Sequence, residues 1–383
     1  MNRGPAREIR RLVFWCNIPS PHQLPYIREL AALPEFEDVV LVAAGGISMD
    51  RASLGWENPV TGRVRLFITP NAATVVQLLS MDPQKTVHLL GGLRGHPYGP
   101  PVLKGRLREG FGCGLISESP DDRGWKGHLR RFRYFVEAVR YHRRIDFILA
   151  MGENGTRWFR GAGWPGGTLF PFAYVTESFP VKPEARAGNE PARTVQLAYV
   201  GRLIYQKGVD LLIRALQQIP PNLDWRLSVI GSGEMDAELR RLARELGVGS
   251  RIVFRGVVPH SQVPEAMCRS DLLLFPSRCD GWGAVVNESL MCGTPVLCSD
   301  HCGARDLLKE PWRGEVLSSD AMPAWTEALG RWIQKGPLPA RERTRIADWS
   351  RCIGGPEIAR YFNAILKHVY QDQSRPAPPW TYE

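Results

Sequence analysis

Two basic residues in the second half of the chain have the character of an anion-binding site. Arg202 and Lys207 follow the apolar run 195–200 directly, and Lys207-Gly208 opens the next amphipathic segment. The free N–H groups at a helix N-terminus and the helix dipole add to such side-chain charges. Arginine offers a planar fork for phosphate oxygens and lysine a mobile point charge. Taken alone, however, such a pair is more often a solvated surface feature.

Two acidic residues further along the chain give the most specific signal. Asp280 and Glu288 are eight residues apart in the glycine-rich segment PSRCDGWGAVVNE, which follows a short apolar run. Carboxylates accept hydrogen bonds from sugar hydroxyls, so this pair suits a ligand with a sugar at each end. The backbone amides that can donate to sugar or phosphate oxygens are those of Gly281, Trp282, Gly283 and Ala284.

A third candidate is the glycine pair Gly231 and Gly233 at another strand-to-helix junction. Glycine lets the backbone approach a ligand closely. The pair lacks the third glycine of a dinucleotide-binding fingerprint, so it does not predict NAD binding. A plain tight turn explains it equally well.

The elements that must position these residues alternate along the chain in the manner of parallel sheets covered by helices. The expected strands of the first half are 10–17, 38–44, 64–69, 86–90, 113–118 and 146–151. Those of the second half are 195–200, 226–230, 252–255, 272–275 and 295–298, with helices at 207–219, 234–246, 262–269 and 286–292. Ligands bind at the carboxyl edge of such sheets. His22, His96 and Glu118 lie near that edge in the first half, as acceptor-positioning or structural residues more often than as chemical groups.

The pattern divides the chain into two α/β domains, 1–180 and 195–352. Residues 181–194 are polar and rich in proline, glycine and alanine, which favours a linker. In the C-terminal segment, 353–383, a helix near 356–370 is expected to pack back on the first domain. The final residues, SRPAPPWTYE, are expected to be extended or disordered.

The motifs of the second half resemble those of the retaining glycosyltransferases of family 4, of the type that builds bacterial cell-surface polysaccharides. G-R-L-x-x-x-K-G, a G-x-G turn, P-S-x-x-[ED]-G-[FW]-G and E-x-x-x-x-G-x-P-V occur in order between Tyr199 and Leu307. The resemblance implies a GT-B fold, in which two Rossmann-like domains face each other across a cleft. It also implies transfer of a sugar, with retention, from a nucleotide-diphosphate sugar to an acceptor hydroxyl of a glycan or a lipid-linked glycan.

The resemblance assigns roles by position. Arg202 and Lys207 hold the diphosphate and its developing charge, and Asp280, where the family usually has glutamate, contacts the transferred sugar. Glu288 binds the ribose hydroxyls. The remaining donor contacts implied are Gly201, Gly231, Gly233, Val257 and the loop Gly281, Trp282, Gly283 and Ala284. Since two cations and a helix N-terminus can neutralise the leaving diphosphate, neither a metal nor another cofactor is expected.

Composition limits the other possibilities. No run approaches the ~20 apolar residues of a membrane-spanning helix, and the N-terminus MNRGPAREIRR lacks the apolar core of a secretory signal. The eight cysteines include no C-x-x-C pair, which disfavours a zinc site. A cytoplasmic protein is expected, either free or peripheral on the inner face of a membrane.

The net charge of +10 is concentrated between Arg123 and Arg144, where eight basic residues accompany one acid, Glu137. Phe132, Phe135, Val136 and Val139 have the spacing of one helical face. The first interpretation is a surface helix with this face on the core. The second is attraction to an anionic membrane surface or a phosphorylated acceptor. Nucleic acid is not expected, because no recognised binding module accompanies the charge.

Two alternatives to a transferase remain open. A sugar-nucleotide epimerase of GT-B shape would use the same donor without an acceptor, and a non-catalytic protein would bind the nucleotide sugar without turnover.

Overall fold

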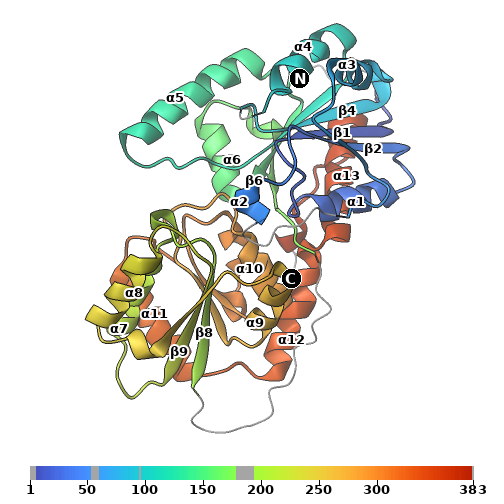
Figure 1. The fold of residues 1–383 in the computed structure, drawn as a ribbon. Coiled ribbons are helices and arrows are strands. Elements are labelled where there is room, and N and C mark those ends of the chain that lie inside the picture. Colours follow the sequence, from blue (N-terminus) through green and yellow to red (C-terminus); the bar gives the residue numbers. More distant parts are fainter. Residues whose placement is uncertain (1–5, 53–59, 95, 178–193, 382–383) are drawn as a thin grey trace. The chain divides into compact units, whose positions relative to one another are not determined.

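The computed structural model describes residues 6–52, 60–94, 96–177 and 194–381. The chain forms two compact units, each built on one sheet (Figure 1). The first unit comprises Met1–Met49, Glu57–Glu177 and Cys352–Glu383, and the second Asp50–Trp56 and Ser178–Arg351. The linker expected at 181–194 lies, except for Thr194, outside the described residues.

The first unit contains a seven-stranded sheet in the order β3-β2-β1-β4-β5-β6-β7, with every neighbouring pair parallel. Its strands are β1 (Arg11–Cys16), β2 (Asp38–Ala43), β3 (Arg65–Ile68), β4 (Thr86–Gly91), β5 (Gly112–Ser117), β6 (Phe147–Met151) and β7 (Leu169–Phe172). Its helices are α1 (Leu24–Ala32), α3 (Ala72–Ser80), α4 (Gly99–Glu109), α5 (Gly124–Tyr141), α6 (Gly152–Gly161) and α13 (Gly355–Gln371); the short α2 (Met49–Ala52) spans the boundary between the units.

Successive strand residues point to opposite sides of the sheet, and other elements cover both of its faces. Val13 and Trp15 of β1 belong to a core shared with residues of α3, α4, α5 and α6. Between them, Phe14 points to the other face, where its ring meets Tyr26 of α1 and Phe362 of α13. The C-terminal helix thus packs against α1 and completes the first unit (Figure 1).

The second unit has a six-stranded sheet in the order β10-β9-β8-β11-β12-β13, also parallel throughout. Its strands are β8 (Val195–Val200), β9 (Trp225–Ile230), β10 (Ile252–Gly256), β11 (Leu272–Phe275), β12 (Val296–Ser299) and β13 (Gly314–Leu317). Its helices are α7 (Val209–Gln217), α8 (Asp236–Glu245), α9 (Val263–Cys268), α10 (Ala284–Met291), α11 (Met322–Lys335) and α12 (Ala340–Trp349). Helices α7, α8 and α11 cover one face, and α9 and α10 the other (Figure 1).

The α/β class and the alternation of elements are confirmed, and the strands of both sheets begin and end close to the expected residues. The edge strands β7 and β13 are missing from the prediction. Each has only four residues, and Pro171 inside β7 weakens its strand signal. The tail has no helix or strand up to Pro378, as an extended segment would, but it is packed, so the disordered alternative was wrong. Trp380 is buried against Tyr361, and the guanidinium of Arg375 lies over the ring of Phe170.

The first interpretation of the basic helix was also wrong. The face of α5 that packs on the core carries Gly127, Glu137 and Ala138, while Phe132 is 64% and Val139 60% exposed. The spacing of the apolar residues identified a helix but not which side of it faces inward. Among the described residues, no helix has the length and apolar character that crossing a membrane requires.

Candidate functional site

The candidate residues of the second unit lie where the strand order of its sheet reverses. β8 is central, with β9 and β10 on one side and β11, β12 and β13 on the other. The loops after β8 and β11 therefore diverge, and a crevice forms beyond the carboxyl ends of these two strands. The loop after β8 carries Arg202 and Lys207, and the loop after β11 carries Asp280. The fold thus brings the predicted cations and the first predicted acid to one switch point.

Lys207 and Asp280 are in direct contact. The Lys207 ammonium donates a hydrogen bond to Asp280 Oδ2 and lies 5.4 Å from the centre of the Phe275 ring. The other carboxylate oxygen, Oδ1, accepts from the backbone N–H of Trp282 at 3.1 Å. The side chains of the ion pair are only 18% and 14% exposed, so each charge is compensated within the loops.

Arg202 lies in the same loop as Lys207 and is exposed. Its backbone carbonyl accepts a hydrogen bond at 2.9 Å from the hydroxyl of Tyr199, the penultimate residue of β8. Burial raises the pKa of Tyr199, the charge of Asp280 raises it further and that of Arg202 opposes the rise. Tyr199, which motif reasoning missed, therefore lies within the field of both charged groups and anchors the turn that presents Arg202.

The glycine-rich loop after Asp280 leads into α10 through a residue that must be glycine. Gly283 has φ +90°, and a Cβ there would lie 2.8 Å from both Cys302 Sγ and the Phe275 ring. The Trp282 side chain is buried, and its indole N–H donates to Asn287 Oδ1 at 2.9 Å. Trp282 therefore stabilises the loop through its ring, while the first-turn N–H groups of α10 point toward its N-terminus. That end of a helix favours anions.

Glu288 lies in the second turn of α10 and is 5% exposed. Burial raises the pKa of this carboxyl to about 8, because the charged form loses its hydration. At neutral pH the side chain is therefore mainly protonated, and it can donate as well as accept a hydrogen bond.

The structure gives a packing reason for both glycines of the pair. A Cβ on Gly231 would lie 2.0 Å from the carbonyl oxygen of Gly201, and one on Gly233 would lie 2.3 Å from that of Leu203. The Gly231 N–H donates to the Gly256 carbonyl at 2.8 Å. These glycines therefore hold the loops after β8, β9 and β10 against one another. Val257, which follows β10, is 42% exposed beside them.

The candidates of the first unit lie at the corresponding edge of its own sheet. The backbone N–H of Val175 donates to the His22 carbonyl at 2.9 Å. Glu118, which follows β5, and Gln23 both hydrogen-bond the hydroxyl of Tyr174, and burial raises the pKa of that tyrosine. Tyr174 belongs to no motif, and only the structure shows that it links the segment of Gln23 to the loop of Glu118.

His96 is occupied within its own turn. Its Nδ1 accepts from the backbone N–H of Tyr98 at 3.3 Å, and its Nε2 lies 3.1 Å from the Gly92 carbonyl. Burial lowers the pKa of His96, so a neutral ring that donates from Nε2 satisfies both contacts. The geometry gives His96 a role in shaping the loop between β4 and α4.

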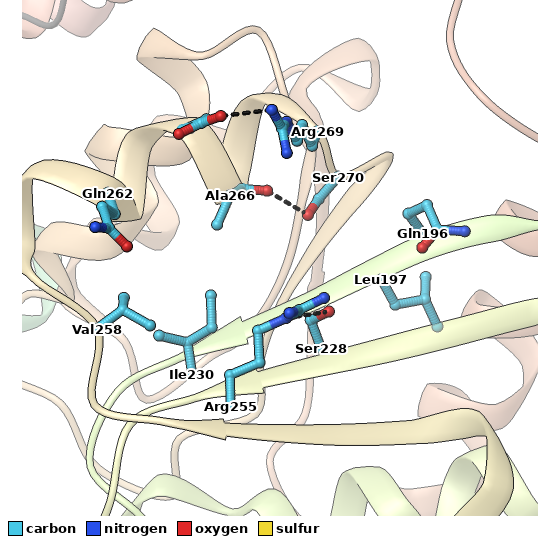
Figure 2. A pocket seen from close by; sticks show the side chains of 11 residues that line it. Gln196, Leu197, Ser228, Ile230, Arg255, Val258, Gln262, Ala266, Arg269 and Ser270 are labelled. Carbon is cyan, nitrogen blue, oxygen red and sulfur yellow. Dashed lines mark hydrogen bonds and ion pairs between the residues drawn. The ribbon is translucent and has the colours of Figure 1, made fainter.

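A pocket of about 430 Å³ lies between the face of the second sheet and α9 (Figure 2). Its lining includes Gln196, Ser228, Ile230, Arg255 and Val258. Arg255 extends along the strands and contacts Ser228, 3.3 Å away. Ile230 and Val258 lie next to Gly231 and Val257, so one end of the pocket adjoins the candidate site. The charged residues of that site, Arg202, Lys207 and Asp280, do not line the pocket.

Two Rossmann-like units, each built on a parallel sheet, are the architecture of the GT-B fold. Residues 181–348 match the family described as Glycosyl transferases group 1. This match covers most of the second unit, and the expected resemblance to family 4 is confirmed.

Individual proteins agree with this assignment. The chain is 35% identical over 118 residues to an uncharacterized glycosyltransferase of Methanocaldococcus jannaschii, covering 31% of this chain and 30% of that protein. It is 30% identical over 203 residues to a GDP-mannose-dependent alpha-(1-6)-phosphatidylinositol monomannoside mannosyltransferase of Mycolicibacterium smegmatis, covering 48% and 52%. The matches thus span about a third of the length of the first relative and about half of the length of the second.

The fold extends over the whole chain. The structure of HepE from Anabaena in complex with UDP and glucose superimposes with a TM-score of 0.68 at 16% identity, covering 94% of this chain and 99% of that one. At this identity the likeness establishes the GT-B fold of both halves.

Proposed function

We propose that this protein transfers a glycosyl group from a nucleoside diphosphate sugar to an acceptor hydroxyl. The observation that carries the proposal is the contact between Lys207 and Asp280, beside Arg202, at the switch point of the second sheet. A diphosphate linked to a sugar presents two anionic groups next to a polyhydroxyl ring. Two cations beside a carboxylate, at the start of α10, complement that junction.

The residues take roles that follow from their chemistry. Arg202, exposed and cationic, and Lys207 stabilise the charge that develops on the diphosphate as its bond to the anomeric carbon breaks. A new bond forms from the acceptor oxygen to that carbon, and the hydroxyl proton is released. Asp280 accepts from hydroxyls of the transferred sugar, and Glu288 bonds the ribose. Retention of configuration is proposed from the family resemblance.

Donor binding must rearrange the ion pair. With Asp280 as its partner, Lys207 is only partly available to a phosphate. An incoming diphosphate competes for the ammonium, and the freed carboxylate oxygen then meets the sugar hydroxyls. The pair thus keeps both groups compensated until the two parts of the donor arrive together.

The base, sugar and acceptor are open to test. HepE holds UDP, and the mycobacterial relative is named for GDP-mannose, so UDP- and GDP-sugars are the first donors to try. We propose a glycan or lipid-linked glycan as the acceptor, in polysaccharide or glycolipid synthesis. We further propose that transfer needs no metal ion, and activity that persists in EDTA would support this.

The experiment is a transfer assay with radiolabelled UDP- and GDP-sugars, with and without lipid-linked glycan acceptors. Label should enter the acceptor, and Asp280→Asn and Lys207→Ala should each reduce the incorporation. Label recovered in an epimerised donor without acceptor would identify an epimerase instead. Tight nucleotide binding without turnover for any donor and acceptor pair would favour a binding protein.

A further inference from the structure

One face of α5 carries a row of exposed apolar side chains. They are Trp125, Leu129, Phe132, Phe135, Val136 and Val139, between 48% and 72% exposed. Their spacing places them within about a third of the helix circumference. The opposite side of α5, with Gly127, Glu137 and Ala138, is already buried in the first unit. The apolar face is therefore a second, outward surface that the core does not require.

Cations border this surface. Lys126, Arg133 and Arg140 fall along one flank of the row at helical spacing, and Arg144 lies in the turn that follows α5. The segment from Arg123 to Arg144 contains a single acid. That acid, Glu137, is 9% exposed and pairs with Arg94, with 2.5 Å between Arg94 Nε and Glu137 Oε1. The outward surface is consequently both apolar and strongly positive.

A groove on this surface is lined by both charged and apolar side chains. It has a volume of about 270 Å³, and its lining includes Arg133 and Arg140, the ion pair of Arg94 and Glu137, and the apolar side chains of Phe132 and Val136. Arg94 compensates Glu137, and a phosphate group seated by Arg133 and Arg140 would have hydrocarbon side chains directly beside it. An anionic lipid presents the same combination, because its charged headgroup phosphate lies next to its apolar acyl chains.

We propose that α5 is a membrane-docking helix that lies in the surface of an anionic lipid bilayer. Phe132, Val136 and their apolar neighbours enter the boundary between headgroups and acyl chains. Arg133 and Arg140 bind lipid phosphates at the edge of the helix. This inference depends on the surface of the first unit and stands apart from the donor chemistry of the second.

Other partners fit the surface less well. Nucleic acid would satisfy the arginines but leave six large apolar side chains in water. A second copy of this chain, paired through the same surface, would bring the two cationic flanks together, and like charges oppose such an interface. A bilayer that contains acidic lipid satisfies both the apolar row and the cations.

The test uses the full chain and vesicles of phosphatidylcholine, with or without phosphatidylglycerol. Two double variants change only exposed positions, F132S/V136S and R133E/R140E, so the fold should persist. The matched control is L107S/R108E on α4, where Leu107 is 63% exposed and Arg108 is also exposed. Vesicle cosedimentation gives the partition coefficient, and quenching by brominated lipid compared between wild type and W125F reports insertion of Trp125.

The wild type and the control should bind the acidic vesicles, and binding should weaken as salt rises. Replacing two cations by glutamate, as in R133E/R140E, should lower the partition coefficient at least about 30-fold, and F132S/V136S should lower it at least about tenfold. Equal binding of all four proteins, or no binding by the wild type, would overturn the proposal. Two other outcomes would also overturn the proposal if neither variant alters vesicle binding. One is a dimer that F132S/V136S abolishes, and the other is DNA binding that R133E/R140E abolishes. Donor affinity measured without lipid should be the same in all variants, so failure here leaves the proposed transfer intact.

Discussion

Replacing Glu288 with glutamine removes one buried ionisable group while nearly preserving its shape. The side chain is 5% exposed, and burial raises its pKa from the ordinary 4.5 to about 8. Between these values the folded protein retains a proton that the unfolded chain releases. The contribution of Glu288 to stability is therefore complete below about pH 4.5 and is lost as the pH rises toward 8.

The size of this effect follows from the two pKa values. Each pH unit inside the window costs at most about 1.4 kcal/mol, so raising the pH from 6 to 8 should destabilise the wild type by about 2 kcal/mol through this group. For a unit of this size, that corresponds to a fall in Tm of about 4 to 8 °C. Glu288→Gln has no proton to lose at this position. Between pH 6 and pH 8 the Tm of this variant should therefore fall by about 4 to 8 °C less than the Tm of the wild type.

The assay is thermal unfolding of both proteins at pH 6 and pH 8 in matched ionic strength. Comparison within the pair cancels the titration of all other groups. Glu245→Gln, which changes an exposed carboxyl at the end of α8, is the control and should follow the wild type. If wild type and Glu288→Gln lose stability in parallel, Glu288 is ionised throughout this range, and the reasoning from burial is refuted.

Three further outcomes are expected. Arg202→Ala should weaken binding of a nucleoside diphosphate at least about tenfold by calorimetry, and an equal loss for the monophosphate would contradict its diphosphate role. Gly231→Ala should lower the free energy of unfolding in urea by at least about 2 kcal/mol through its contact with the β8 loop, whereas Gly247→Ala, with φ +71° and open space around its Cβ, should cost less. Burial lowers the pKa of His88 to about 3, so its contribution to stability should be lost as the pH falls from about 6.5 toward 3; His88→Gln, which keeps an acceptor for Trp15, should flatten this acid limb of the unfolding curve.

The sequence determined the features that depend on local order. Each buried parallel strand is a short apolar run, so the strands from β8 to β12 could be located from composition and spacing alone. The segment from Asp280 to Glu288 identified a loop and a helix start because its glycines and carboxyls are neighbours along the chain. For the same reason the motifs were sufficient to indicate the family that residues 181–348 confirm.

The tertiary structure decided what depends on separation in space. Lys207 and Asp280 are 73 residues apart, and only the order of the strands places β8 beside β11 and brings them into contact. The reason for Gly231 is a backbone carbonyl in another loop, which no local pattern reveals. The spacing of Phe132 and Val136 is the same whether their face meets the core or the solvent. Helical periodicity fixes which residues share a face, but burial is fixed by what the rest of the chain places against it.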